Sequence, residues 1–180
     1  FNGKEGPYLE DDPVNPISVY GKSKLAAEKY LLNSNISHTI VRANVLYSYA
    51  PATKASFLKW VVESLKDSKA INVVSDQWNN PTSTNSLSDF INRIALSQTS
   101  GLYHYADRGI MSRFEFAKTI ASVFDLDSSL IKPVLTSDLN QIAPRPLKSG
   151  LRTQKINKEL SIYPPEVKES LKSIYNTLIP

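Results

Sequence analysis

The sequence contains no cysteine, and histidine and glycine are scarce. Without cysteine the described chain has no disulfide scaffold, no cysteine zinc site and no thiol nucleophile. The two histidines, His38 and His104, are too far apart for a metal-binding motif, so we expect no metal. There are six glycines against eleven prolines, and no glycine-rich turn links a strand to a helix. The turn that holds the phosphates of a dinucleotide is therefore missing from these residues.

No apolar stretch approaches the roughly 20 residues of a membrane span, and no signal peptide or lipidation motif is visible. We therefore expect a cytoplasmic protein with no membrane partner. The net charge of +4 permits an anionic ligand. The chain has no basic helix or aromatic platform, so we expect no nucleic-acid partner. Because it starts at Phe1 and not at methionine, we expect a piece of a longer protein.

Apolar residues recur with helical spacing in some segments and form short β-rich runs in others. Asn15 before Pro16 predicts the start of the first helix, and the spacing of Ser112 and Glu115 predicts a capping box. Residues 77–84 are expected to form a polar loop, and residues 126–150 an irregular stretch that could include a strand at 133–135. The remaining predicted elements are helices at 17–32, 56–65, 86–97, 112–124 and 165–178, and strands at 38–47, 70–75 and 101–105.

The strongest local indication of catalysis in the sequence is the pair Tyr20 and Lys24. They lie four residues apart on the first predicted helix, so their side chains share one face. An ammonium group close to a phenol favours the phenolate and lowers the tyrosine pKa from its usual value of about 10. Such a tyrosine can act as a general acid or base on a carbonyl or alcohol. The alternative is an ordinary exposed Tyr and Lys on a helix surface.

The residues around this pair extend the signal over nearly the whole chain. Residues 8–24 (YLEDDPVNPISVYGKSK), 41–48 (VRANVLYS), 76–82 (DQWNNPT) and 101–104 (GLYH) carry motifs at characteristic distances. Together they resemble the extended short-chain dehydrogenase/reductase family. Residues 144–149 (PRPLKS) are similar to the late motif of one branch of that family, the dTDP-4-dehydrorhamnose reductases.

The alternation of strands and helices predicts an α/β fold with at least part of a parallel sheet. The resemblance implies the C-terminal part of a Rossmann-like parallel sheet and a small α+β substrate-binding lobe. We expect residues 1–75 to form the remainder of the NAD(P)-binding domain, including the Tyr20/Lys24 helix. Residues 76–180 are expected to form mainly the lobe, with interleaved Rossmann elements.

The resemblance also implies a reaction, the reduction of a 4-keto nucleotide sugar with NADPH or NADH. Tyr20 would donate the proton, and Lys24 would hold the ribose hydroxyls and lower the tyrosine pKa. The acid-free stretch 145–158 suits the substrate diphosphate, because arginine offers a two-pronged fork to phosphate oxygens. The implied cofactor-binding residues are Tyr20, Lys24, Ala43, Asn44 and Val45, and the implied substrate-binding residues are Asn44, Trp78, Arg145 and Lys148.

A non-catalytic relative that keeps the fold and binds a partner is the alternative, as in the regulatory subunit of methionine adenosyltransferase, which resembles the same branch. The reductases commonly carry tryptophan where this sequence has Val45, which slightly favours that alternative. The presence of both Tyr20 and Lys24 favours the enzyme. A homodimer is compatible with either function, and Trp60 on the helix at 56–65 is a candidate for packing or a subunit contact.

Other conspicuous residues have structural interpretations. Trp78 is expected to anchor a lid over a pocket, and His104, at the end of an apolar strand, to be a hydrogen-bonded core residue. The acidic residues 10–12 are expected to form a solvated loop.

Overall fold

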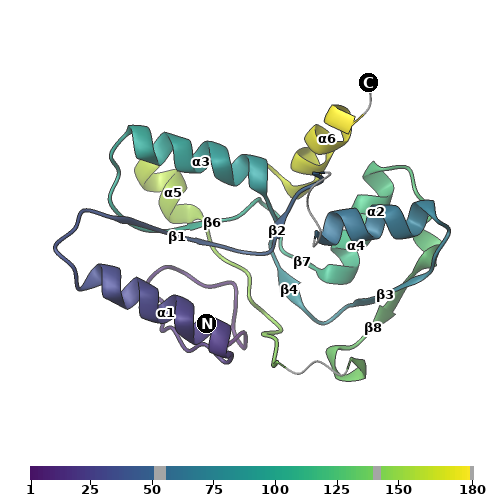
Figure 1. The fold of residues 1–180 in the computed structure, drawn as a ribbon, viewed down its shortest axis with the longest axis horizontal. Coiled ribbons are helices and arrows are strands. Elements are labelled where there is room, and N and C mark those ends of the chain that lie inside the picture. Colours follow the sequence, from purple (N-terminus) through teal and green to yellow (C-terminus); the bar gives the residue numbers. More distant parts are fainter. Residues whose placement is uncertain (51–55, 140–142, 179–180) are drawn as a thin grey trace.

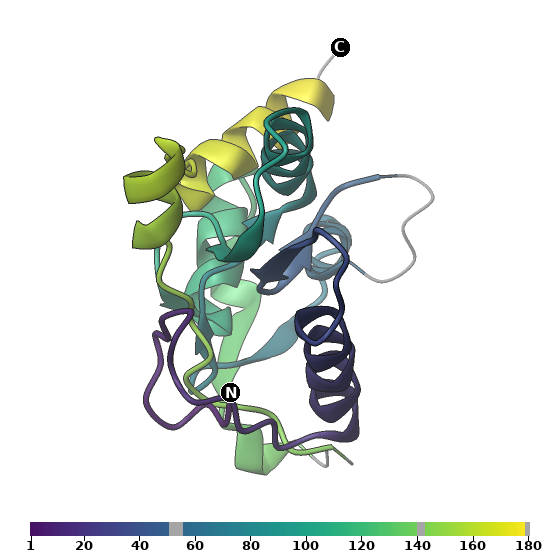
Figure 2. The same ribbon diagram turned by 90° about the vertical axis from the view of Figure 1, so that its left-hand side faces the viewer.

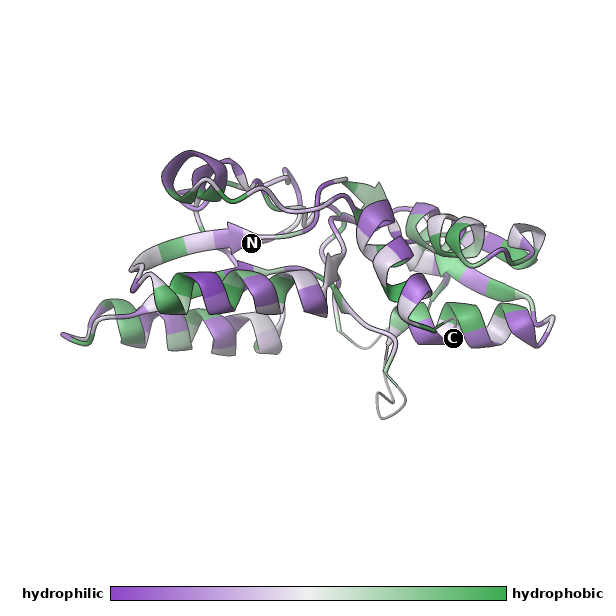
Figure 3. Cartoon of the chain, turned by 90° about the horizontal axis from the view of Figure 1, so that it is seen from above, coloured by the Kyte–Doolittle hydropathy of each residue, from purple (hydrophilic) through white to green (hydrophobic). Residues whose placement is uncertain are grey.

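Residues 1–50, 56–139 and 143–178 are described by a computed structural model, in which short strands run between two groups of helices (Figure 1). The described strands form four pairs, three of them parallel and one antiparallel. The predicted α/β class is therefore confirmed. Seen from above, the two groups lie at opposite ends of the long axis (Figure 3).

The first group is built on β1 (Thr39–Ala43) and β6 (Gly101–Tyr105), which pair in parallel. Helices α3 (Thr84–Leu96) and α5 (Gln154–Leu160) lie on one side of this pair, and α1 (Val19–Leu32) lies on the other (Figures 1 and 2). Ile40 of β1 is buried. A cluster of buried apolar residues in this group consists of Phe90, Ile94, Tyr103, Tyr105, Ile156 and Ile162. Helix α1 adds no buried residue to them.

The second group is built on β3 (Ile71–Val74) and β8 (Ile131–Val134), which also pair in parallel. Three helices pack with them: α2 (Phe57–Lys66), α4 (Arg113–Val123) and α6 (Val167–Leu178). The buried core of this group is the larger of the two. It consists of Tyr47, Leu58, Val61, Val62, Leu65, Ile71, Val73, Phe116, Ala117, Ile120, Ala121, Phe124, Ile131, Val167, Leu171 and Ile174.

The chain passes between the two groups several times. Apolar residues between 58 and 73 pack into the core of the second group. Apolar residues in 90–105 and 156–162 pack in the first group. The division into two domains at residue 75 stays a prediction.

Short strands connect the groups. β2 (Leu46–Tyr47) pairs in parallel with β5 (Thr82–Ser83), and β4 (Trp78–Asn79) pairs antiparallel with β7 (Met111–Ser112). Beside them the buried Asp107 carboxylate accepts hydrogen bonds from the Tyr47 hydroxyl (3.3 Å), the Ser83 N–H (3.1 Å) and the Ser86 hydroxyl (2.5 Å). Burial raises the pKa of Asp107, and the serine hydrogen bonds oppose this shift.

Two predicted segments differ from the structure in the middle of the chain. The strand expected at 38–47 is divided into β1 and β2, because Val45 has a φ of 38°, which lies outside the extended region. The loop expected at 77–84 contains β4, β5 and the first residue of α3. These strands are two residues long, which is too short for an alternating pattern to be detected.

The helix starts were predicted with mixed success. The capping box is confirmed, with the Glu115 N–H donating to Ser112 Oγ (3.1 Å) and the Ser112 N–H donating to the Glu115 carboxylate (2.8 Å). The cap predicted at Asn15 is wrong, since α1 begins at Val19 and Ser18 Oγ accepts the Gly21 N–H (3.1 Å).

The C-terminal third contains more regular structure than expected. Strand β8 occupies 131–134, and helix α5 was not predicted. Residues 140–142 of the expected irregular stretch lie outside the described residues.

Glu10 and His104 form a buried polar contact near the start of the chain. The expectation of a solvated loop is wrong for Glu10, which is 9% exposed and accepts the His104 N–H at 2.9 Å. The fully buried His104 ring lies with Nδ1 at 3.2 Å from the Tyr8 carbonyl oxygen, which confirms its interpretation as a hydrogen-bonded core residue. Burial is the main cause of a lowered His104 pKa, and the Arg42 charge lowers it further.

Candidate active site

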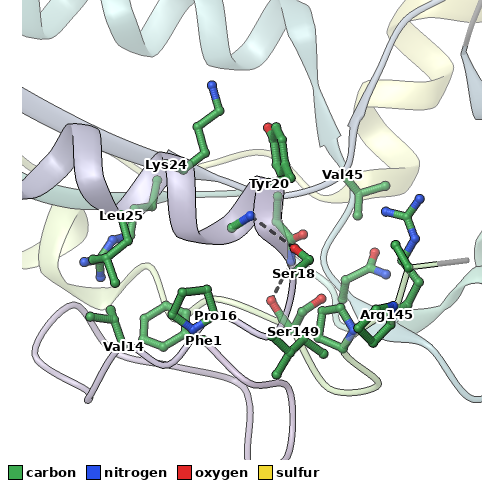
Figure 4. A pocket seen from close by; sticks show the side chains of 18 of the residues that line it. Phe1, Val14, Pro16, Ser18, Tyr20, Lys24, Leu25, Val45, Arg145 and Ser149 are labelled. Atoms are coloured by element: carbon green, nitrogen blue, oxygen red, sulfur yellow. Dashed lines mark hydrogen bonds between the residues drawn. The ribbon is translucent and has the colours of Figure 1, made fainter.

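A cavity of about 810 Å³ opens where the carboxyl end of β1 meets the first half of α1 and the segment 143–149 (Figure 4). The carboxyl ends of parallel strands are the usual ligand-binding edge of an α/β sheet. The polar residues that line the cavity are Ser18, Tyr20, Lys24, Glu28, Arg42, Asn44, Gln77, Asn79, Arg113, Arg145 and Ser149.

Tyr20 and Lys24 line this cavity together from α1. Their side chains project from the same side of the helix, and Lys24 Nζ lies 5.4 Å from the centroid of the Tyr20 ring (Figure 4). A cation at this distance from an aromatic face is attracted by the ring quadrupole. Tyr20 is 72% exposed, and within the described residues its hydroxyl makes no hydrogen bond, so it can reach a ligand.

Ala43, Asn44 and Val45 follow one another at the end of β1, and all three line the cavity. The Asn44 side-chain amide donates to the Ser149 carbonyl oxygen (2.7 Å), which ties the end of β1 to the segment 143–149. The left-handed backbone of Val45 turns the chain away from the line of β1 toward β2. The three residues therefore form the floor between α1 and the opposite wall.

Arg113 and Arg145 carry the positive charge of that opposite wall. Burial and the nearby Arg145 charge both lower the pKa of Arg113, and the Arg113 guanidinium lies over the Phe57 ring, 5.3 Å from its centroid. Within the described residues neither arginine forms an ion pair with a carboxylate. Two neighbouring guanidinium groups on one wall, with no carboxylate paired to either, favour the binding of an anion.

Sequence reasoning identified Arg145 but missed Arg113. Arg113 is the first residue of α4, directly after the Ser112 cap, and its N–H donates to the Gln77 carbonyl oxygen (3.1 Å). This contact and the pairing of Ser112 with Trp78 place Arg113 near the segment 143–149, because Trp78 bonds to that segment. We find no signal in the local sequence that could have indicated its position.

Trp78 and Lys148 do not line the cavity with the other predicted site residues. They line a separate pocket of about 240 Å³ with Gly6, Pro7, Ile110 and Gly150. Successive side chains of a strand point to opposite faces. Gln77 and Asn79 face the larger cavity, so Trp78 between them faces away from it.

No group of three or more His, Asp or Glu side chains within residues 1–50, 56–139 and 143–178 is placed to hold a metal ion. Among the same residues, every helix is too short or too polar to cross a bilayer. Trp60 is 42% exposed on α2 and packs against Phe57, with 5.6 Å between ring centroids. A subunit contact at Trp60 stays a prediction.

The parallel strands, the helix carrying Tyr20 and Lys24, and the cavity at the carboxyl end of β1 define a Rossmann-like protein of the extended short-chain dehydrogenase/reductase class. Residues 1–179 match the family described as RmlD substrate binding domain. The chain belongs to this family.

Two relatives show the similarity in sequence and in structure. The dTDP-4-dehydrorhamnose reductase of Sinorhizobium fredii is 33% identical over 190 residues, with 99% of this chain and 63% of the relative covered. The crystal structure of dTDP-4-dehydrorhamnose reductase from Bacillus anthracis in complex with NADP superposes with a TM-score of 0.91 at 29% identity. That match covers 98% of this chain and 62% of the solved chain. The chain thus spans about three-fifths of the length of these relatives.

A third relative is named as a subunit of a different enzyme. Methionine adenosyltransferase 2 subunit beta of Bos taurus is 29% identical over 143 residues, with 76% of this chain and 43% of the relative covered. The proteins similar to this chain therefore include some named as reductases and one named as a subunit of another enzyme.

Proposed function

We propose that this chain carries the proton donor and the substrate-binding wall of a reductase that uses NADPH, or NADH, to reduce a 4-keto nucleotide sugar. One observation carries the proposal. Tyr20 with Lys24 on one side, and Arg113 with Arg145 on the other, line one cavity of about 810 Å³. The relatives named dTDP-4-dehydrorhamnose reductase support the same reaction class.

The nicotinamide cofactor supplies the hydride when bound. This chain would contact it through the Lys24 ammonium, which forms no ion pair within the described residues and can donate hydrogen bonds to ribose hydroxyls. The small Ala43 side chain at the end of β1 leaves space for a flat ring on the cavity floor. These residues fit the cofactor.

Tyr20 would donate the proton. Its hydroxyl is exposed to the cavity and can donate to the C4 oxygen of the keto sugar as negative charge develops there. The resulting phenolate is stabilised by the Lys24 ammonium one turn along α1. Asn44 and Val45 would lie between the reacting carbon and the opposite wall.

Arg145 and Arg113 would bind the diphosphate that links the sugar to its nucleoside. A guanidinium forms two parallel hydrogen bonds with phosphate oxygens, and the bound anion removes the repulsion between the two arginines. Trp78 and Lys148, which face the second pocket, are not assigned to this part of the substrate.

The proposal is tested by substituting Tyr20→Phe in the full-length protein and following NADPH oxidation with a dTDP-4-keto-6-deoxy sugar. Loss of a general acid should lower the rate by about 10²–10⁴-fold. Tyr30→Phe is the matched control, because Tyr30 is 77% exposed on the same helix and does not line the cavity. Tyr20→Phe with the wild-type rate would show that the proposal is wrong.

A non-catalytic subunit is the second candidate, and Val45 is the observation that favours it. The branch commonly places an aromatic ring at this position against the sugar, and the relative named methionine adenosyltransferase 2 subunit beta belongs to the same set of matches. Copurification with an adenosyltransferase, together with no turnover of any keto sugar by the wild-type protein, would favour this candidate over the reductase.

A further inference from the structure

Helix α1 carries the proposed proton donor, and within the described residues its apolar packing is limited to half-buried side chains such as Leu25 and Leu31. None of its fourteen residues is buried, and Val19 and Leu32 are 85% and 56% exposed. A proton donor must be held to within about an ångström, since a shift of that size can cost 10²-fold in rate. A polar contact between α1 and β1 adds to this limited packing.

That interaction is an ion pair between Glu28 on α1 and Arg42 on β1. Arg42 Nε lies 3.0 and 3.1 Å from the two carboxylate oxygens of Glu28, and Nη2 lies 2.7 Å from Oε2. Both side chains are half-buried, with exposed fractions of 15% for Arg42 and 18% for Glu28. A two-pronged arginine–carboxylate contact of this kind fixes orientation as well as distance.

The position of Glu28 on α1 links the pair to the chemistry. Tyr20, Lys24 and Glu28 follow at intervals of four residues, so they lie along one stripe of the helix. Arg42 directly precedes Ala43 on the cavity floor. The ion pair therefore connects the stripe that carries the proton donor to the strand that ends beneath the ligand.

Arg42 is itself fixed by contacts on its other side. Its Nη1 donates to the Glu10 carbonyl oxygen (3.3 Å) and lies 3.4 Å from His104 Nε2. The Tyr8 carbonyl beside His104 Nδ1 can only accept, which assigns the proton to Nδ1 and leaves Nε2 to accept from Arg42. Contacts with His104 of β6 and with Glu10 of the N-terminal loop thus fix the Arg42 guanidinium in addition to its ion pair with α1.

We infer that Arg42 and Glu28 are positioning residues, whose ion pair sets the place of Tyr20 and Lys24 over the end of β1. Arg42 lines the same cavity as Arg113 and Arg145, but its guanidinium already pairs with the Glu28 carboxylate. It is therefore not a third ligand for the diphosphate. The effect of the pair on turnover rests on the proposed function, whereas its effect on α1 does not.

The test compares Glu28→Gln and Arg42→Lys with the wild type in the full-length protein. Hydrogen exchange of peptides covering 19–32 should become faster by about tenfold or more, because a charged hydrogen-bonded contact is lost. The turnover number should fall by about 10–100-fold, since the proton donor is misplaced. The KM for the nucleotide sugar should change by less than about twofold, because Arg113 and Arg145 are untouched.

Glu166→Gln is the matched control, because its pair with Arg108 (3.6 Å) is exposed and remote from the cavity. The charge-reversed double variant Glu28→Arg with Arg42→Glu should recover part of the protection of α1. Unchanged exchange in 19–32, or faster exchange in every element alike, would overturn the inference. If the wild type reduces no keto sugar, the proposed function fails and the exchange data still decide the role of the pair.

Discussion

Arg145→Gln tests the anion-binding wall. The substitution removes one guanidinium from the wall that carries Arg113 and Arg145, neither of which pairs with a carboxylate among the described residues. A hydrogen bond to a charged group contributes about 1.5–3 kcal/mol. Since about 1.4 kcal/mol corresponds to a tenfold change, the dissociation constant for dTDP should rise by about 10- to 150-fold.

Although Arg145→Gln should weaken dTDP binding, it should not destabilise the ligand-free protein. The Arg145 charge is one cause of the lowered Arg113 pKa, so its removal relieves a repulsion that exists only without an anion. Arg145→Gln should therefore leave the thermal midpoint of the ligand-free protein unchanged or slightly raised. A residue that acts mainly in packing would lower it.

Lys148→Gln is the matched control, because Lys148 belongs to the same basic segment but lines the other pocket. Titration calorimetry with dTDP and thermal unfolding without it give the two readouts. If both variants weaken dTDP binding equally, only the general charge of the segment matters and the reasoning is refuted. Unchanged affinity in Arg145→Gln would refute it as well.

Two further predictions concern stability. The pKa of the buried His104 is lowered from its ordinary value of 6.5, so His104 takes up a proton at a higher pH in the unfolded chain than in the folded protein. The free energy of unfolding should therefore fall as the pH drops below about 6.5, by up to about 1.4 kcal/mol per pH unit. His104→Gln should flatten this dependence in urea titrations between pH 5 and 8, and a slope that remains as steep as in the wild type would contradict it. Gly3→Ala should destabilise the protein by about 1–3 kcal/mol, because Gly3 has a φ of 75° and an added Cβ would lie 2.2 Å from the Pro146 Cβ. Gly150→Ala, where the nearest atoms lie at 3.5 Å, should be tolerated in the same denaturation assay.

The parts of the site that were predictable from the sequence depend on local geometry. Tyr20 and Lys24 share a face of α1 because residues four apart on a helix are neighbours, wherever that helix packs. The capping box at Ser112 was predictable for the same reason, since all its partners lie within four residues. The cap of α1 was mispredicted because Asn15 and Ser18 both suit a cap, and the pattern alone did not decide between them.

The parts that were missed depend on contacts between distant segments. Arg113 reaches the cavity because its N–H bonds to Gln77, some 36 residues earlier in the chain, and because Ser112 pairs with Trp78. Trp78 and Lys148 line a pocket separate from the cavity of Tyr20 and Arg145, because the direction of the Trp78 side chain depends on the partner strand of β4. Their contact with a substrate stays a prediction. The ion pair of Glu28 and Arg42 joins a helix to a strand whose packing the sequence does not specify.

The two hydrophobic clusters have no side chain in common. Effects of mutations in separate cores are close to additive, so a change in one need not be compensated in the other. Substitutions that reshape the wall with Arg113 can thus accumulate during divergence while the strand and helix that place the proton donor stay unaltered. Under the proposed function, such a division would allow the ligand specificity of the wall to change without a change at Tyr20 and Lys24.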